Sequence, residues 1–161
     1  MLIEFDLMPE DARLWIYQAN RPLSNQEFSF VKKYTEQFLS QWQAHGQDLI
    51  ASYKIKYNQF LVISVDETSS KASGCSIDSS VHLIKDLEKE LEISFITTNK
   101  VAFLIEDKIH LFSFNNLKEQ ISNSIITQET KVFDNTVKNI EEFKTKWLVP
   151  STQTWVRRYF K

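Results

Sequence analysis

Three side chains of this 161-residue chain are of types that could perform chemistry together: Cys75, His45 and Asp66. Cys75 follows Gly74 at the expected start of a helix, where unpaired backbone N–H groups and the helix dipole favour a thiolate. A histidine can activate a cysteine nucleophile, and an acid can fix the tautomer of that histidine. The pattern therefore predicts a thiol site with Cys75 as the nucleophile, His45 as its base or counter-ion, and Asp66 or Asp48 as the orienting acid.

A second kind of site would use the same region without covalent chemistry. The N–H groups at the expected helix start, together with Ser73, Gly74, Ser76 and Lys71, would suit a phosphate or a carboxylate. Three acids in this region oppose an anion because they add negative charge: Asp66, Glu67 and Asp78. The sequence thus predicts Lys71, Ser73, Gly74 and Ser76 as ligand-binding residues, as an alternative to the thiol site.

A structural interpretation of the same residues stays open beside these two. A single cysteine is commonly a small buried hydrophobic residue, and Ser73 or Ser76 would then simply cap the helix. His45, expected in the last turn of the preceding helix, would interact with the helix dipole without any catalysis.

Composition excludes several classes of function. The only two glycines, Gly46 and Gly74, stand too far apart to form a phosphate-binding P-loop or a dinucleotide-binding turn. One cysteine excludes an intrachain disulfide and a cysteine-based zinc or iron–sulfur site, and the three histidines have no metal-binding spacing. We therefore expect no metal and no other cofactor. The 19 basic and 21 acidic side chains give a net charge of -2, which argues against nucleic acid and acidic membranes as partners.

The segments that position these residues follow from periodicity. Strands are expected at 13–18, 51–57, 60–65, 101–105 and 109–114. Ser24 and Glu27 fit a capping box at the start of the first helix, and Gly46 is expected to end it. A second helix is expected from about Ser76 to Leu91. The segment 60–65 is apolar except for Ser64, which predicts a central strand.

This order of strand, helix, strand, strand, helix, strand is the split βαβ arrangement of ferredoxin-like folds. We therefore predict an α+β fold, with a ferredoxin-like antiparallel sheet, two helices on one face and a C-terminal helical extension. The chain is expected to form a single domain over 1–161, with a core of about 1–114 and an extension of about 115–161. In this topology the first helix and the third strand end where the second helix begins, which brings His45 and Asp66 towards Cys75.

Several segments resemble a family of short uncharacterised bacterial proteins that often carry the label "ABC transporter ATPase". They are 41–46 (QWQAHG), 57–60 (YNQF), 65–67 (VDE) and above all 72–78 (ASGCSID). The likeness covers roughly residues 1–114. It implies a small soluble protein and no particular chemistry, because ATP hydrolysis of the transporter kind needs a P-loop and an LSGGQ-like signature, and this sequence contains neither.

From these observations we predict a small binding or interaction module without catalytic chemistry. Its partner is expected to be a small ligand or a protein, a second copy of the chain included. Tyr53, Ile55 and Tyr57 are expected on the sheet face that the helices leave uncovered, and the aromatic and basic tail 155–161 is expected to pack as a short helix. The alternative is a cysteine-dependent enzyme or thiol sensor that uses Cys75, His45 and Asp66. An unpaired cysteine without an export signal predicts a cytoplasmic location.

Overall fold

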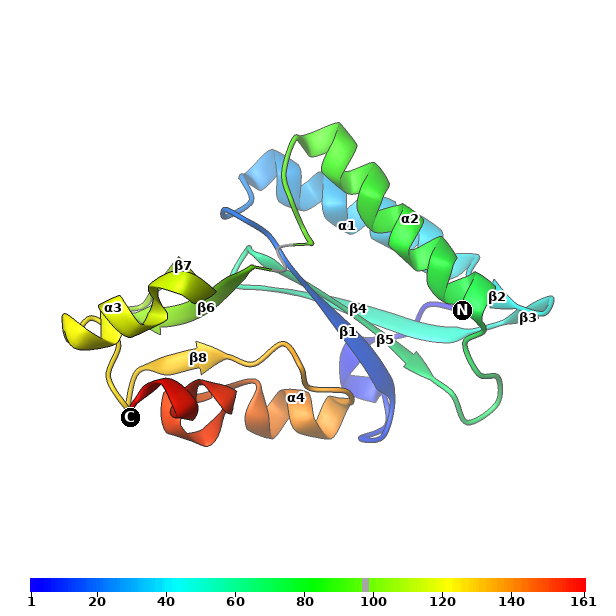
Figure 1. The fold of residues 1–161 in the computed structure, drawn as a ribbon. Helices are drawn as coiled ribbons and strands as arrows, with labels where there is room; N and C mark the ends of the chain where they lie inside the picture. Colours follow the sequence, from blue (N-terminus) through cyan, green and yellow to red (C-terminus); the bar gives the residue numbers. More distant parts are fainter. Residues whose placement is uncertain (97–98) are drawn as a thin grey trace. The chain divides into compact units, whose positions relative to one another are not determined.

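The computed structural model describes residues 1–96 and 99–161 (Figure 1). Within these residues the chain is a mixed α+β protein with four α-helices and antiparallel sheets. It divides into two compact units, of which the first comprises 1–97 with 138–141 and the second 98–137 with 142–161. In the described residues no helix is both long and apolar enough to cross a membrane.

The first unit contains a three-stranded antiparallel sheet in the order β1-β5-β4. Its strands are β1 (Arg13–Gln18), β4 (Ile50–Lys56) and β5 (Phe60–Asp66). The central position of β5 is confirmed, and its first six residues are all buried. A central strand packs on both faces, which explains why its sequence is a continuous apolar run rather than an alternation.

Two long helices, α1 (Asn25–Ser40) and α2 (Gly74–Leu91), lie on the same side of this sheet (Figure 1). Both begin with a capping box. The Ser24 hydroxyl accepts from the Glu27 N–H, and the Ser73 hydroxyl accepts from the Ser76 N–H. The apolar faces of the helices and the sheet form one core, which includes the buried side chains of Val31, Leu39, Leu61, Ile63, Val65, Leu83, Ile84 and Leu87.

The prediction that Gly46 ends the first helix is wrong. That helix ends at Ser40, and Gly46 lies with His45 in the tight turn between the two-residue strands β2 (Gln43–Ala44) and β3 (Gln47–Asp48). His45 and Gly46 both have positive φ, 51° and 77°. Two successive residues with positive φ are what a two-residue hairpin turn requires, and glycine favours that turn as much as a helix end.

The face predicted for the aromatic residues of β4 is also wrong. Tyr53 and Ile55 pack against the core shared with α1 and α2, so they lie on the helix-covered side of the sheet. Tyr57 lies beyond the strand, in the turn to β5, with φ of 54°. The alternation along β4 indicates a strand correctly, but which set of residues faces the helices depends on how the sheet packs, and the alternation alone does not settle it.

The second unit forms its own antiparallel sheet, in the order β7-β6-β8-β9. The strands are β6 (Lys100–Ile105), β7 (Lys108–Ser113), β8 (Lys131–Phe133) and β9 (Leu148–Pro150). The strands predicted at 101–105 and 109–114 are confirmed, and they pair with each other as an antiparallel hairpin. The expectation that 101–105 completes the first sheet is wrong. The edge of β1 where it would pair is partly taken by bridges from Arg13 to Asn139 and from Gln18 to Ile96.

Helical segments complete the second unit, although the extension is not purely helical. They are η2 (Phe114–Asn116), α3 (Leu117–Ser122), part of α4 (Ile140–Lys146), η3 (Ser151–Gln153) and η4 (Trp155–Tyr159). Val156 is fully buried, and Trp155, Tyr159 and Phe160 pack against the core that contains Phe103 and Leu117. The tail thus packs as a short helix, as its sequence predicts.

Charge is divided unequally between the two units. The first carries 10 basic and 15 acidic side chains, for a net charge of −5, and the second carries 9 basic and 6 acidic, for +3. The net charge of −2 is therefore the sum of an acidic first unit and a basic second unit.

The capping box of α1 should make stability depend on acid pH. The Glu27 carboxylate accepts two hydrogen bonds from the Arg21 guanidinium, both 2.8 Å long, and one from the Ser24 N–H. These bonds lower the pKa of Glu27 to about 2, and the hydrogen bonds from Arg21 make the largest contribution. We expect Glu27→Gln to lower the free energy of unfolding by about 1 kcal/mol at pH 7, because the amide keeps the cap but loses the ion pair.

The sign of this pH dependence follows from the lowered pKa. The stabilisation is complete above the ordinary glutamate pKa of about 4.5 and is lost as the pH falls towards 2, where the folded carboxylate also takes up a proton. Urea denaturation of the wild-type protein and of the Glu27→Gln variant, at pH 7 and at pH 2, measures this pH dependence. A difference in stability that stays the same at both pH values would contradict this account of the ion pair.

Candidate functional site

The predicted thiol site is only partly assembled. Cys75 is exposed in the first turn of α2, and His45 is exposed in the hairpin turn between β2 and β3. The two regions do come together, because β2 packs against α2 and the Trp42 indole N–H donates to the Ser76 carbonyl at 2.8 Å. This contact holds the hairpin, and not a helix end as predicted, against the start of α2.

The two predicted orienting acids bind other partners. Asp66 accepts hydrogen bonds from the N–H and the hydroxyl of Thr68, and Asp48 accepts from the side-chain amide of Gln43 at 2.8 Å. In the part of the chain that the structure describes, no hydrogen bond or ion pair links Cys75, His45 and Asp66. Nor does any group of three His, Cys, Asp or Glu side chains among these residues come together as a metal site.

The predicted ligand-binding residues are used mainly by the helix cap. The Ser76 N–H donates to the Ser73 hydroxyl, and the Ser73 N–H donates to the Ser76 hydroxyl. The Ala72 N–H donates to the Glu67 carboxylate at 2.9 Å. The four predicted residues, Lys71, Ser73, Gly74 and Ser76, thus lie close together in the chain. The N–H groups of Ser73 and Ser76 already have partners in the helix cap.

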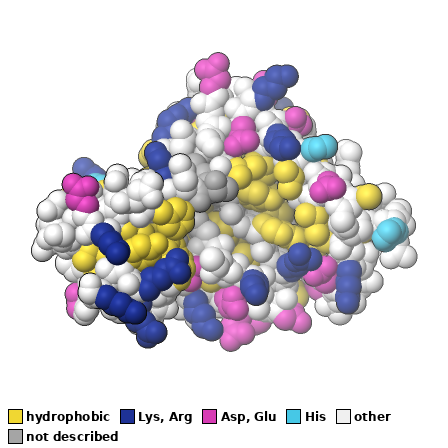
Figure 2. Space-filling model, viewed as in Figure 1, with side chains coloured by type: hydrophobic (Ala, Val, Ile, Leu, Met, Phe, Trp, Pro, Cys, Tyr) yellow, Lys and Arg dark blue, Asp and Glu magenta, His cyan; other side chains and the backbone are white. Residues whose placement is uncertain are grey.

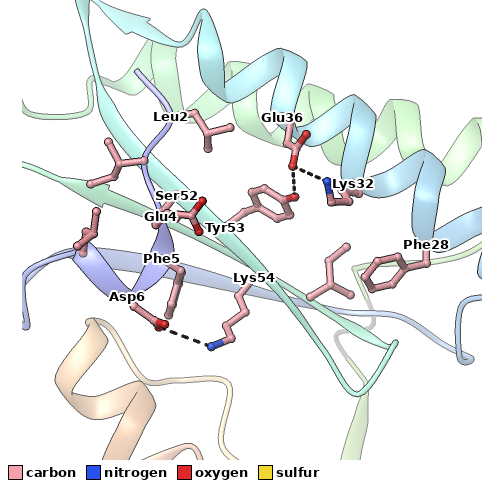
Figure 3. Close-up of a pocket in the computed structure, with 13 residues that line it drawn as sticks. Leu2, Glu4, Phe5, Asp6, Phe28, Lys32, Glu36, Ser52, Tyr53 and Lys54 are labelled. Atoms are coloured by element: carbon pink, nitrogen blue, oxygen red, sulfur yellow. Dashed lines mark hydrogen bonds and ion pairs between the residues drawn. The ribbon is translucent and has the colours of Figure 1, made fainter.

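A more developed site is a groove of about 720 Å³ beside β4, which we call the β4 groove (Figure 3). Its walls are the N-terminal segment 2–7, which includes η1 (Phe5–Leu7), and one side of α1. Figure 3 shows Phe28, Lys32 and Glu36 on the α1 side and β4 running between the two walls. Its volume is typical of pockets that bind small ligands or short peptides.

The floor of the β4 groove is an open sheet edge. Ala51 turns both backbone groups away from β5: its N–H donates to the Met1 carbonyl, and its carbonyl accepts from the Ile3 N–H, both at 2.9 Å. Backbone groups alternate in direction along a strand, so Tyr53 and Ile55 direct theirs to the same side. Within the described residues no backbone partner meets them, because the N-terminal segment leaves the edge after Ile3.

A hydrogen-bond network fixes one side of the groove. The Tyr53 hydroxyl donates to the Glu36 carboxylate at 2.5 Å, and the Lys32 ammonium lies 3.0 Å from the same carboxylate oxygen (Figure 3). Burial and the bond to Glu36 raise the pKa of Tyr53, while the Tyr53 hydroxyl and then Lys32 lower the pKa of Glu36. At neutral pH the phenol therefore keeps its proton, and it is a fixed donor rather than a base or nucleophile.

The other side of the groove presents a cation. The Lys54 ammonium lies 5.3 Å from the centre of the Phe5 ring and 3.9 Å from an oxygen of Asp6. The Asp6 side chain is 90 % exposed, and pairs of this kind contribute little to stability. Lys56 follows Lys54 on the same face of the strand.

Sequence reasoning missed the β4 groove, although it identified the strand. The alternation of Tyr53, Lys54, Ile55 and Lys56 indicates a half-exposed strand, but only the sheet order places that strand at an edge. Comparisons with known proteins do not add to this picture, since no family model, no curated protein and no solved structure matches the chain.

Proposed function

We propose that the protein is a binding module that takes an extended peptide segment of a partner into the β4 groove. The observation that carries this proposal is the open edge at Tyr53 and Ile55, whose N–H and carbonyl groups face a groove instead of another strand. An extended segment can add to such an edge as a further strand, with main-chain hydrogen bonds supplying affinity and side-chain pockets supplying specificity. The open stretch, about 52–56, offers room for roughly five residues.

Two rows of side chains define which segment fits. Residues of an added strand that lie opposite Tyr53 and Ile55 share their face and would meet Phe28, which favours apolar side chains. Residues opposite Lys54 and Lys56 would meet two cations, which favours acidic side chains. The segment should therefore alternate between apolar and acidic residues, and the weak pair of Asp6 with Lys54 already places one carboxylate beside this row.

A second copy of the chain suits this edge less well than a different partner. If two copies paired their β4 strands antiparallel, centred on Ile55, Lys54 of each copy would lie opposite Lys56 of the other. Like charges opposite each other destabilise a strand pair. A homodimer through another surface stays a prediction.

The test uses two matched peptides and the full chain. The peptide Ac-Ser-Val-Glu-Val-Glu-Val-Ser-NH2 should bind, and its counterpart with lysine at both glutamate positions should bind at least about tenfold more weakly, because each cross-strand charge pair contributes about 0.2–1 kcal/mol. Fluorescence anisotropy of labelled peptides measures both affinities. Equal affinity for the two peptides, or binding of neither, would contradict the proposal.

The alternative of a cysteine-dependent enzyme or thiol sensor stays a prediction. Cys75 is exposed, which suits a reactive thiol. However, in the described residues no hydrogen bond joins Cys75 to His45, which would be needed to activate the thiol. Both candidate acids, Asp48 and Asp66, accept hydrogen bonds from other residues. The raised pKa of Tyr53 keeps its phenol protonated, so this side chain supports a binding role and not that of a catalytic base or nucleophile.

We also infer a relation of the first unit to ferredoxin-like folds. Its elements β1, α1, β4, β5 and α2 follow the ferredoxin-like order, and the sheet order β1-β5-β4 agrees with three of the four strands of that arrangement. Membership of the family of short bacterial proteins, a single domain over 1–161 and a cytoplasmic location stay predictions.

A further inference from the structure

A second groove, of about 780 Å³, lies wholly within the second unit, and we call it the C-terminal groove. Its lining includes Thr152, Thr154, Trp155, Arg157, Arg158 and Lys161. It is unrelated to the β4 groove, which is lined only by residues of the first unit.

The lining of the C-terminal groove is rich in donors and cations. Arg157, Arg158 and Lys161 are exposed there, and no aspartate or glutamate side chain lines the groove. Among the residues that the structure describes, these three cations form no ion pair with a carboxylate. They also lie in the unit whose net charge is +3. Figure 2 shows Lys and Arg side chains gathered at the lower left of the viewed face, over the C-terminal segment.

Aromatic rings hold one of these cations in position. The Arg158 guanidinium lies 5.6 Å from the centre of the Trp155 ring and 5.3 Å from that of Tyr159. Trp155 in turn packs on Phe114, with 5.4 Å between ring centres. An arginine positioned by rings keeps its N–H donors for another acceptor, and a guanidinium fork matches the oxygens of a phosphate group.

We propose that the C-terminal groove binds a phosphate-bearing ligand. Arg157, Arg158 and Lys161 would neutralise the phosphate charge and donate hydrogen bonds to its oxygens. The net negative charge of the whole chain does not oppose a phosphate here, because the excess of acidic side chains lies in the first unit and the second unit is basic. The phosphate could belong to a free phosphorylated compound or to a single-stranded nucleic acid.

The test titrates the full chain with inorganic pyrophosphate and, separately, with a ten-residue oligothymidylate. NMR amide shifts would locate binding, and calorimetry would give affinities. We expect at least one probe to shift the amides of 152–161. Binding of pyrophosphate points to a free phosphorylated compound as the source. Binding of the oligonucleotide alone, with affinity that falls steeply with salt, points to a nucleic acid strand.

Matched charge removals make the result specific. Arg157→Gln and Arg158→Gln should each lower the affinity for the probe by about tenfold or more, as expected when a hydrogen bond from a charged group is lost. Lys108→Gln removes one positive charge from the same unit outside the groove and should change the affinity less than about threefold. The proposal is overturned if neither probe binds, if all three variants weaken binding equally, or if polyglutamate shifts the amides of 152–161 as strongly as the phosphate probes do.

Discussion

Ile55→Pro should abolish binding of the acidic peptide at the β4 groove while the sheet stays intact. The Ile55 N–H points away from β5, so proline removes a donor that no strand of the sheet uses. Proline is tolerated at such edge positions, and its ring blocks an approaching strand. We expect at least a tenfold loss of affinity, because a main-chain hydrogen bond is lost and its neighbours cannot form. Anisotropy with the labelled acidic peptide measures it.

Two controls separate the blocked edge from a loss of packing. Ile55 contacts the core of the first unit and also lines the groove. Ile55→Ala therefore removes the side-chain contacts but keeps the N–H, and it should weaken peptide binding clearly less than Ile55→Pro does. Circular dichroism should show the same secondary structure for both variants. Proline and alanine variants that bind the peptide equally well would rule out strand addition at this edge.

Trp42→Ala should lower the free energy of unfolding by about 3–5 kcal/mol, a large part of the stability of a small protein. The Trp42 side chain is only 3 % exposed and packs edge-on against Trp15 and beside Phe38. Its indole N–H donates to the Ser76 carbonyl, so the substitution removes both core volume and the link between the β2–β3 hairpin and α2. Chemical denaturation gives the free energy of unfolding.

Trp42→Phe is the matched variant, because it keeps an aromatic ring in the core and removes the indole donor. It should cost clearly less than alanine, about 1–2 kcal/mol. A loss below about 1 kcal/mol for Trp42→Ala would show that the hairpin and α2 do not depend on this contact, and would contradict the packing described for the first unit.

Local signals in the sequence predict most of the elements of the fold. The capping box at Ser24 and Glu27 and the apolar run of β5 are encoded in a few neighbouring residues, and both are confirmed. The position of β6 is predictable but its sheet is not, because pairing with β8 joins segments far apart in the sequence. The role of Gly46 is ambiguous in the sequence because a glycine with positive φ ends a helix and forms a hairpin turn equally well.

The candidate site is harder to predict than the fold. Sequence reasoning looks for reactive types such as Cys75 and His45, whereas the β4 groove depends on backbone groups of Tyr53 and Ile55, which nearly every residue type possesses. Their exposure follows from the end of the N-terminal pairing at Ile3 and from the sheet order. The basic character of the second unit cannot be seen in the net charge of the whole chain, because the larger negative charge of the first unit cancels it.

Amide hydrogen exchange with and without the acidic peptide tests the central claim most directly, because it reports on the backbone groups at the open edge. Strand addition should slow exchange of the Tyr53 and Ile55 amides when the peptide is bound. The Lys54 amide, which faces β5, should serve as an internal reference and change little. Slower exchange at Tyr53 and Ile55 alone is the predicted result. Peptide binding that leaves both amides unchanged would contradict the account.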